Sequence, residues 1–414
     1  YMPSGMGVET AWADTATTVI NNATAFANMD SNGNYVLGGN ITISQPYGKE
    51  FSGTFDGKGY TVELNITGTE ANTGLFSTLV GGATVKNVIT AGSIEASDCN
   101  NVGGIAGKAD TSNGRSITIE KCKNTAELTG KKNVGGILGY SETTNATVSI
   151  KSCANAKRIE GSIYVGGIVG NLEGKHLIEN CYNRDEISAT GTCAGVAGRC
   201  VEGVDIRNCY TIGTINSQNG VLILGTASST SPLTQITNCY ALTSEKELLP
   251  TANATYSESN VLKKTESEMK SEEFATLLGT AFMYKAGDYP ALKWETPTAS
   301  VNFDITPANA VLSINGATYT GSCNVALPAG KHDYTVSLDG YTQESGVIKV
   351  TENEGVLTAD PKSVAVSLEK DSTLWTDVHF AVTPDTATFE LKDGEPTVQP
   401  SAESQFTYSV LKSH

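Results

Sequence analysis

Three kinds of side chain that could do chemistry recur in step along the middle of this chain. Cysteine ends an apolar-x-x-Cys pattern at roughly thirty-residue intervals, at Cys122, Cys153, Cys181, Cys209 and Cys239. A tyrosine directly follows the last three, as Tyr182, Tyr210 and Tyr240. Glutamate recurs with the same period, as Glu95, Glu127, Glu160 and Glu186. A shared period predicts that each kind of side chain forms a column on stacked repeats.

The cysteine column has three interpretations: a metal site, a ladder of disulfides, or a buried structural position. Val88 occupies the cysteine slot in the preceding repeat, so the position accepts a small apolar side chain. Paired CxxC spacing is absent, which disfavours zinc. Disulfide torsions also fit in-register stacking poorly. We therefore expect buried free thiols, with no metal site and no cofactor.

The tyrosines follow inward-facing cysteines, so they are expected to point outward and to stack one turn apart. A ladder of exposed aromatic rings is a platform for sugar rings or for a partner protein. Tyr182, Tyr210 and Tyr240 are therefore the candidate ligand-binding residues. The alternative is a stack that stabilises the sheet face or packs under a loop.

The glutamates could line one face of a polysaccharide-cleaving fold, because such enzymes need clustered carboxylates. Alternation along a half-exposed strand also places polar residues outward without catalysis, and we favour that interpretation. The four histidines (His176, His332, His379 and His414) are scattered, and no HExxH, GxSxG or GxxxxGK[ST] motif occurs. A turn at 30–34 resembles part of a calcium loop but lacks its closing acid, which favours an ordinary turn. We expect no catalytic residues.

A glycine-rich phrase keeps the same period as the cysteines. It reads VGGIAG at 102–107, VGGILG at 134–139 and VGGIVG at 165–170, with weaker copies at 193–198 and 220–225. Its Val and Ile lie three residues apart, so a straight strand cannot point both inward, and the Gly-Gly between them permits a bend. Two registers locked to one period predict a right-handed parallel β-helix of about six turns.

Asparagines flank the cysteine column on both sides, as Asn124, Asn155 and Asn183 two places after it and Asn180, Asn208 and Asn238 just before it. Asparagine tolerates left-handed backbone and can bond to its copy in the next turn, so these residues are expected at corners of the coil.

Both ends of the coil are expected to be covered, because open sheet edges invite association. A short helix is predicted within residues 15–29. A second is predicted over 266–279, where Met269, Phe274, Leu277 and Leu278 have helical spacing and Gly279 stands at the C-cap.

A different pattern begins near residue 300. Alternating strands broken by Asn-Gly, Pro-Ala-Gly and Asp-Gly turns predict a small Ig-like β-sandwich over 298–370. Its opening recurs at 378–388, which predicts a partial second sandwich over 371–414 and a longer parent polypeptide. The coil with its caps is expected over residues 1–297, with repeats at about 72–240.

Composition restricts the partners. The 414-residue chain is acidic, with a formal net charge of −16, which argues against nucleic acid and anionic membrane surfaces. No stretch approaches eighteen consecutive apolar residues, so no membrane insertion is expected within the chain.

The phrases VGGIAG, VGGILG and VGGIVG, with the lead-in GTFDGKGYTV and the ending DYPALKW, resemble the GLUG repeat over roughly residues 20–295. Residues 301–360, with TPANAVLSINGATY and LPAGKHDYTVSLDGY, resemble PEGA-type modules, although the literal Pro-Glu-Gly-Ala is absent. These resemblances imply a secreted or wall-attached bacterial surface protein. GLUG repeats also occur in the non-catalytic part of bacterial immunoglobulin A peptidases.

The expected function is a non-enzymatic segment of an extracellular bacterial surface protein, an adhesin or stalk that meets a host or cell-wall glycan or protein. Two alternatives stay open: an accessory region of a larger secreted peptidase, and a polysaccharide-degrading β-helix.

Overall fold

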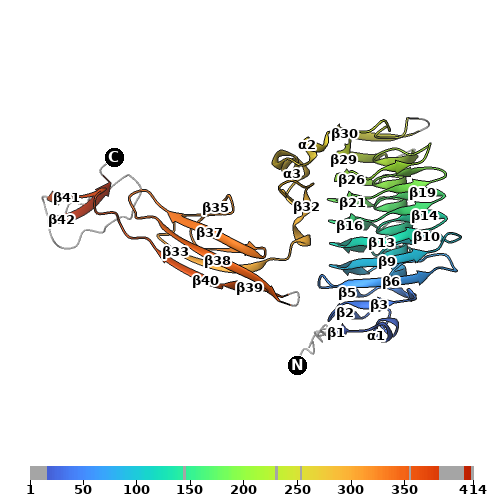
Figure 1. Ribbon diagram of the computed structural model, residues 1–414, viewed down its shortest axis with the longest axis horizontal. Helices are drawn as coiled ribbons and strands as arrows, with labels where there is room; N and C mark the ends of the chain where they lie inside the picture. The colour runs from blue at the N-terminus through green and yellow to red at the C-terminus, as the bar shows by residue number, and fades with distance from the viewer. Residues whose placement is uncertain are drawn as a thin grey trace, which may run out of the picture. The chain divides into compact units, whose positions relative to one another are not determined.

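The computed structural model describes residues 16–142, 146–228, 232–251, 254–353, 356–381 and 405–411. The chain divides into two units, Tyr1–Trp294 and Glu295–His414. The first is built from large parallel sheets wound as a β-helix, and the second from small, mostly antiparallel sheets (Figure 1). The all-β fold class expected from the sequence is confirmed.

One face of the coil is a column of ten parallel strands among the described residues. They are β1 (Thr17–Ile20), β2 (Asn34–Leu37), β5 (Thr54–Asp56), β8 (Thr84–Lys86), β12 (Ile117–Glu120), β16 (Val148–Lys151), β21 (Leu177–Glu179), β26 (Asp205–Thr211), β29 (Thr234–Leu242) and β30 (Tyr256–Lys264).

Beyond the first corner, a second face continues the same turns. It contains β3 (Ile41–Ile43), β6 (Thr61–Thr67), β9 (Ile89–Glu95), β13 (Lys123–Thr129), β17 (Ala154–Asn155), β18 (Ile159–Gly161), β22 (Tyr182–Asn183), β23 (Ile187–Ala189) and β27 (Ile215–Asn216).

The glycine phrase supplies most strands of the remaining two sheets, because it bends at its second glycine and the following residue. The sheet before the bend contains β10 (Asn100–Gly103), β14 (Lys132–Gly135), β19 (Ile163–Gly166) and β24 (Cys193–Ala194). The sheet after it contains β4 (Tyr47–Phe51), β7 (Phe76–Val80), β11 (Ala106–Asp110), β15 (Leu138–Ser141), β20 (Val169–Glu173), β25 (Ala197–Val201) and β28 (Leu224–Ser228). Val134 and Ile137 are both fully buried, as the predicted bend requires.

The coil has more turns than the six expected, because stacking extends beyond the glycine phrases at both ends. The early turns fill the interior with aromatic rings in place of small aliphatic side chains. Phe26, from helix α1 (Ala23–Ala27), packs against Tyr47, Phe55 and Phe76, with ring centroids 5.7–5.9 Å apart. The predicted N-terminal helix is therefore shorter than residues 15–29 and follows strand β1.

Asparagines at one corner adopt left-handed backbone, as predicted. Asn180, Asn208 and Asn238 have φ of 56°, 54° and 53°. The side chain of Asn208 donates to that of Asn180 at 3.2 Å, and Asn238 donates to Asn208 at 2.8 Å.

The other asparagine column lies inside the coil, which the corner prediction did not anticipate. Asn124, Asn155 and Asn183 are fully buried. The Asn124 amide donates to Asn155 Oδ1, and the Asn155 amide donates to Asn183 Oδ1, both at 2.8 Å. Thr90 and Thr211 end the ladder, at 2.9 and 3.2 Å. Buried amides are stable here because each finds its partner in the next turn.

The second glycine of each phrase makes room for this asparagine ladder. A Cβ atom at Gly136 would clash with Gly167 O of the next turn and lie 2.8 Å from Asn155 Cβ, and one at Gly167 would clash with Gly195 O and lie 2.6 Å from Asn183 Cβ. The glycine phrase and the asparagine column therefore contact each other inside the coil, where the missing side chain of glycine permits the close approach.

In the last strand, β30, two of the positions that continue inward-facing columns are occupied by charged residues. Glu258 follows the buried Ile236 in one inward column, and Lys263 follows the buried Ala241 in another. Inward-pointing charges on an edge strand disfavour further strand addition.

The segment after β30 was expected to cover this end, but it runs back along the side of the coil (Figure 1). It contains α2 (Glu266–Met269), α3 (Glu272–Leu278), β31 (Phe282–Met283), β32 (Ala291–Leu292) and the 3-10 turn η1 (Lys293–Glu295). The predicted helix is broken in two, since Ser271 caps α3 through the Phe274 amide. Leu277, expected to be buried, is 41% exposed.

The second unit contains two small sheets that share one core. The first contains β36 (Cys323–Leu327), β33 (Ala299–Thr306) and β40 (Ser363–Ser367). The second contains β35 (Ala317–Thr320), β34 (Val311–Ile314), β37 (Gly330–Ser337), β38 (Glu344–Asn353) and β39 (Val356–Asp360). Phe303 of the first sheet meets Tyr334 of the second edge-on, at 5.2 Å.

The expected second sandwich, 371–414, lies largely outside the described residues. Within it, β41 (Trp375–Ala381) pairs antiparallel with β42 (Gln405–Leu411).

Candidate functional site

The three candidate tyrosines stack in register, as expected. Tyr182 pairs with Tyr210, and Tyr210 with Tyr240, on successive parallel strands. The rings of Tyr182 and Tyr210 lie 5.1 Å apart at an interplanar angle of 13°. They belong to a cluster separate from the coil interior, so they lie on its outer side.

The expected exposure of these rings is wrong. Tyr182 and Tyr210 are 0% exposed and Tyr240 is 1% exposed. The returning segment 266–294, called the strap below, covers them with apolar side chains: Met269, Phe274, Leu278, Phe282 and Leu292. Phe274 meets Tyr210 and Tyr240 edge-on, at 5.9 and 5.2 Å. No ring face is left for a sugar or a partner protein.

Polar contacts tie the strap to successive turns of the coil. Asn238 donates to Leu277 O at 2.8 Å, and the Tyr210 hydroxyl donates to Pro290 O at 2.6 Å. Trp294 Nε1 donates to Ser152 O at 2.8 Å, three turns below Asn238. The strap therefore bridges four consecutive turns.

Arg184 is the polar centre of this contact, and sequence reasoning missed it. Its guanidinium donates to Tyr289 O at 2.8 Å and to Pro290 O at 2.9 Å. It also lies 4.8 Å from the centroid of the Tyr182 ring. Burial opposes the charge, but the nearby Tyr210 and Tyr182 and the Asp288 carboxylate leave the pKa of Arg184 raised. No periodic signal marks Arg184, because only one turn carries it.

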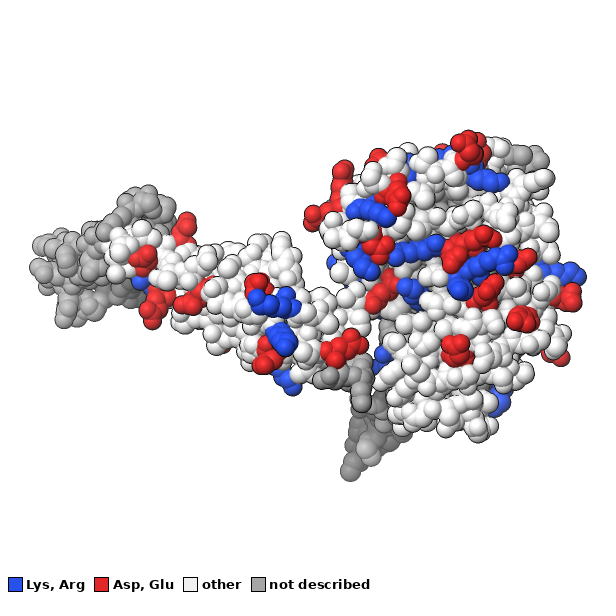
Figure 2. All heavy atoms as spheres, in the orientation of Figure 1, with Lys and Arg blue, Asp and Glu red and all other residues white. Residues whose placement is uncertain are grey.

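The glutamates expected to form a stripe are instead gathered around one arginine. Arg158 lies 3.4 Å from Glu127, 2.8 Å from Glu160 and 3.1 Å from Glu186. Glu95 lies in the column that contains Glu160, two turns before it, with Thr129 between them. Three of the four carboxylates are thus ion-paired with one guanidinium on a half-exposed face, and that group carries two negative charges in excess. Figure 2 shows acidic and basic side chains interspersed on the visible face of the coil.

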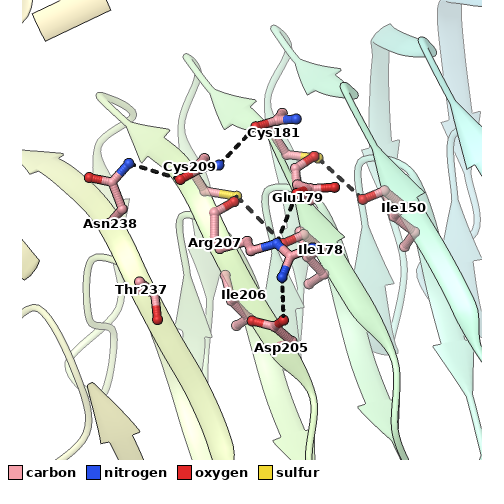
Figure 3. A network of polar contacts seen from close by, with 12 residues as sticks. Ile150, Ile178, Glu179, Cys181, Asp205, Ile206, Arg207, Cys209, Thr237 and Asn238 are labelled. Carbon is pink, nitrogen blue, oxygen red and sulfur yellow. Dashed lines mark hydrogen bonds and ion pairs between the residues drawn. The ribbon is translucent and has the colours of Figure 1, made fainter. Parts of the chain in front are cut away.

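The cysteine column is a set of buried free thiols, as expected. All five are fully buried, and no disulfide links them. Cys181 Sγ contacts Ile150 O of the preceding turn at 3.8 Å, and Cys209 Sγ contacts Ile178 O at 4.0 Å (Figure 3). Burial raises the pKa of Cys181 and Cys209 well above the usual range. Protonated, enclosed thiols are poor nucleophiles and poor metal ligands.

His176 is the one histidine enclosed by the coil in the described residues, at 2% exposure. The Val148 amide donates to its Nδ1 at 3.0 Å, so the proton resides on Nε2, which lies 2.8 Å from Glu173 O. Burial lowers the pKa of His176, with the Glu173 carbonyl partly offsetting the effect. This ring is neutral and serves as a structural connector.

Among the described residues, no group of three or more His, Cys, Asp or Glu side chains is placed to hold a metal ion. No helix in that part of the chain is long and apolar enough to span a membrane.

Comparison of the chain with protein-family profiles, with curated protein sequences and with solved structures found no match in any of the three. The parallel coil itself is consistent with a β-helix-like repeat protein.

Proposed function

We propose that this chain is a non-catalytic stalk segment of an extracellular bacterial surface protein, in which the coil holds other parts of the polypeptide at a distance. The observation that carries the proposal is the stack of ten strands whose recurring reactive side chains are engaged in holding the stack together. Nine steps of about 4.8 Å make a stack about 43 Å long, and the strap brings the chain out beside Ser152, next to the sixth of the ten strands.

Each column that could have supported chemistry has a structural task. The cysteines fill the interior, the asparagines bond from turn to turn, and the tyrosines pack under the strap. Three of the four glutamates form ion pairs with Arg158. This distribution favours a stalk over a polysaccharide-cleaving enzyme, because Glu127, Glu160 and Glu186 are each held in an ion pair with Arg158.

The resemblance of the VGGI phrases to the GLUG repeat, and of residues 301–360 to PEGA-type modules, supports the extracellular bacterial setting. A host or cell-wall glycan or a protein remains the proposed partner of the parent molecule. The tyrosine ladder is not part of this proposal.

Location is tested by labelling intact cells of the producing bacterium with antibodies raised against the purified chain. We expect labelling without permeabilisation. Labelling that requires permeabilised cells would contradict the extracellular assignment.

The absence of catalysis is tested by incubating the chain with plant, bacterial and host polysaccharides and measuring new reducing ends. We expect no release above buffer. Release of reducing ends would contradict the stalk proposal and indicate an enzyme if Glu127→Gln, Glu160→Gln or Glu186→Gln abolishes it. The exposed control Glu63→Gln should then leave the release unchanged.

A further inference from the structure

A column of alternating charge runs along the outer side of the ten-strand face. One residue from each of six successive turns stands in register, and the six are Asp56, Lys86, Glu120, Lys151, Glu179 and Arg207. These six residues are called the charge column below. The sign changes at every turn, so acids and bases are equal in number.

Alternation has a simple intramolecular cause. Neighbouring strands lie about 4.8 Å apart, and like charges at that spacing repel. Arg207 illustrates the arrangement, since its guanidinium lies 2.8 Å from Glu179 and 3.0 Å from Asp205 (Figure 3).

The column has a second property that intramolecular pairing does not require. The column begins with an acid and ends with a base. If a second copy of the chain is turned end over end and placed against the first, each residue of the column therefore faces a residue of opposite charge. A two-fold axis parallel to the strands, midway between Glu120 and Lys151, would place each of these residues opposite the other in a second copy. The same axis places Lys86 opposite Glu179 and Asp56 opposite Arg207.

The two ends of the charge column also differ in surface shape and in local charge. A hollow of about 320 Å³ lies at the Asp56 end of the column, lined by residues that include Asn34, Val36, Thr54, Asp56, Lys58 and Lys86. Its charged residues carry one positive charge in excess, because Asp56 is 7% exposed and pairs with Lys58 at 3.2 Å, while Lys86 adds a second cation. Arg207 stands at the other end with its side chain 42% exposed, beside Glu179 and Asp205, and that group carries one negative charge in excess.

We propose that two copies of this chain associate side by side and antiparallel through the charge column, with Glu120 and Lys151 of each copy at the centre of the interface. A single patch that pairs with itself about a two-fold axis is an isologous interface. The strongly acidic chain, at −16, favours this face for self-association because the column is neutral overall. End-to-end stacking at β30 is disfavoured by the inward Glu258 and Lys263.

The five steps of the column span about 24 Å, which places this interface in the small, low-affinity class. Exposed ion pairs are screened by salt, so the dimer is expected to weaken as ionic strength rises. The proposal does not depend on the proposed function.

The test is sedimentation velocity of the full chain at low and at high salt over a range of concentrations. We expect a dimer at low salt, and Lys151→Glu or Glu120→Lys to weaken it about a hundredfold, because two like-charge contacts then form across the axis. Mixing the two variants restores opposite charges at both contacts, so a heterodimer is expected.

The chain carrying both substitutions separates association from folding. It regains complementary signs across the axis, but it places like charges on adjacent turns within each copy. We expect it to dimerise like the wild type and to melt at a lower temperature. If Lys151→Glu or Glu120→Lys fails to fold by circular dichroism, Lys86→Glu and Glu179→Lys make the corresponding pair.

Matched controls change the net charge equally on exposed residues outside this face, as Glu63→Lys and Lys131→Glu. These controls are expected to dimerise normally. A wild-type chain that is monomeric at low salt, a mixture that stays monomeric, or controls that weaken the dimer equally would each overturn the proposal.

Discussion

At the scale of single residues, each interior asparagine depends on a glycine from the preceding bend. Asn155 is fully buried and bonds to the turns on either side, while Gly136 faces it with no room for a methyl group. An amide in a closed interior is stable only when its donors and acceptors are matched. The glycine phrase is therefore a consequence of the asparagine ladder as well as of the bend.

Gly136→Ala tests this dependence. The added Cβ would clash with the backbone carbonyl of Gly167 and lie 2.8 Å from Asn155 Cβ, so we expect a loss of about 3 kcal/mol in the free energy of unfolding. Urea unfolding followed by circular dichroism measures the loss. The control is Gly48→Ala, because a Cβ there meets nothing within 4 Å, and it should leave the midpoint unchanged. Equal effects in the two variants would contradict the close-approach explanation.

His176 predicts a pH dependence of stability. Its pKa is lowered in the folded chain, so the unfolded chain binds the proton more readily. The contribution of His176 is then complete above the unfolded pKa of about 6.5 and is lost as pH falls below that value.

The measurement is the urea midpoint from neutral pH to pH 5 for the wild type and for His176→Gln. We expect the wild type to lose stability more steeply than the variant over this range. Parallel curves would show that His176 does not titrate with unfolding.

At the scale of elements, the strap covers the tyrosine ladder and buries its rings. The strap places its chain end beside Ser152, three turns below the corner at Asn238, and it hides aromatic rings that the coil alone would expose. Tyr210 lies at the centre, stacked on Tyr182 and touching Phe274 and Phe282.

Tyr210→Ala is expected to release the strap from the coil. Removal of a buried aromatic side chain costs about 4 kcal/mol. Hydrogen exchange should therefore rise in residues 266–294 while strands β12 and β16 stay protected. Tyr210→Phe removes the hydrogen bond to Pro290 O and the one that Arg184 Nε donates to the hydroxyl at 3.1 Å, and should cost about 2 kcal/mol.

The control is Tyr284→Ala, because that side chain is 42% exposed and its loss should leave exchange unchanged. If Tyr210→Ala raised exchange in the coil and the strap equally, the strap would not be a separable element.

At the scale of the whole molecule, the chain joins a long parallel coil to a small antiparallel unit with its own core. Eight of the nine cysteines are buried in the coil unit, and Cys323 is half-buried in the other. Thiol chemistry therefore reports on the two units separately.

Labelling with a thiol reagent such as Ellman's reagent is expected to modify Cys323 slowly in the native chain and all nine cysteines in urea. Burial protects the coil thiols, and it raises the pKa of Cys193 to about 11. Cys323→Ser should abolish native labelling. Fast labelling of a second cysteine would contradict a sealed coil interior.

Periodicity alone determined the stacked coil, the inward cysteine column and the bend at Gly-Gly, because each repeat places the same residues at the same height. Features that do not recur from turn to turn were decided by the tertiary structure. The early turns keep stacking on Phe26, Tyr47 and Phe55, although they lack the glycine phrase. The strap, too, could be placed only by packing. Its apolar spacing predicted burial but not the surface that it covers, and the contacts of Arg184 and Trp294 place it on the tyrosine ladder. Alternation along a strand tells which way a side chain points, whereas its exposure depends on whatever part of the chain folds back over it.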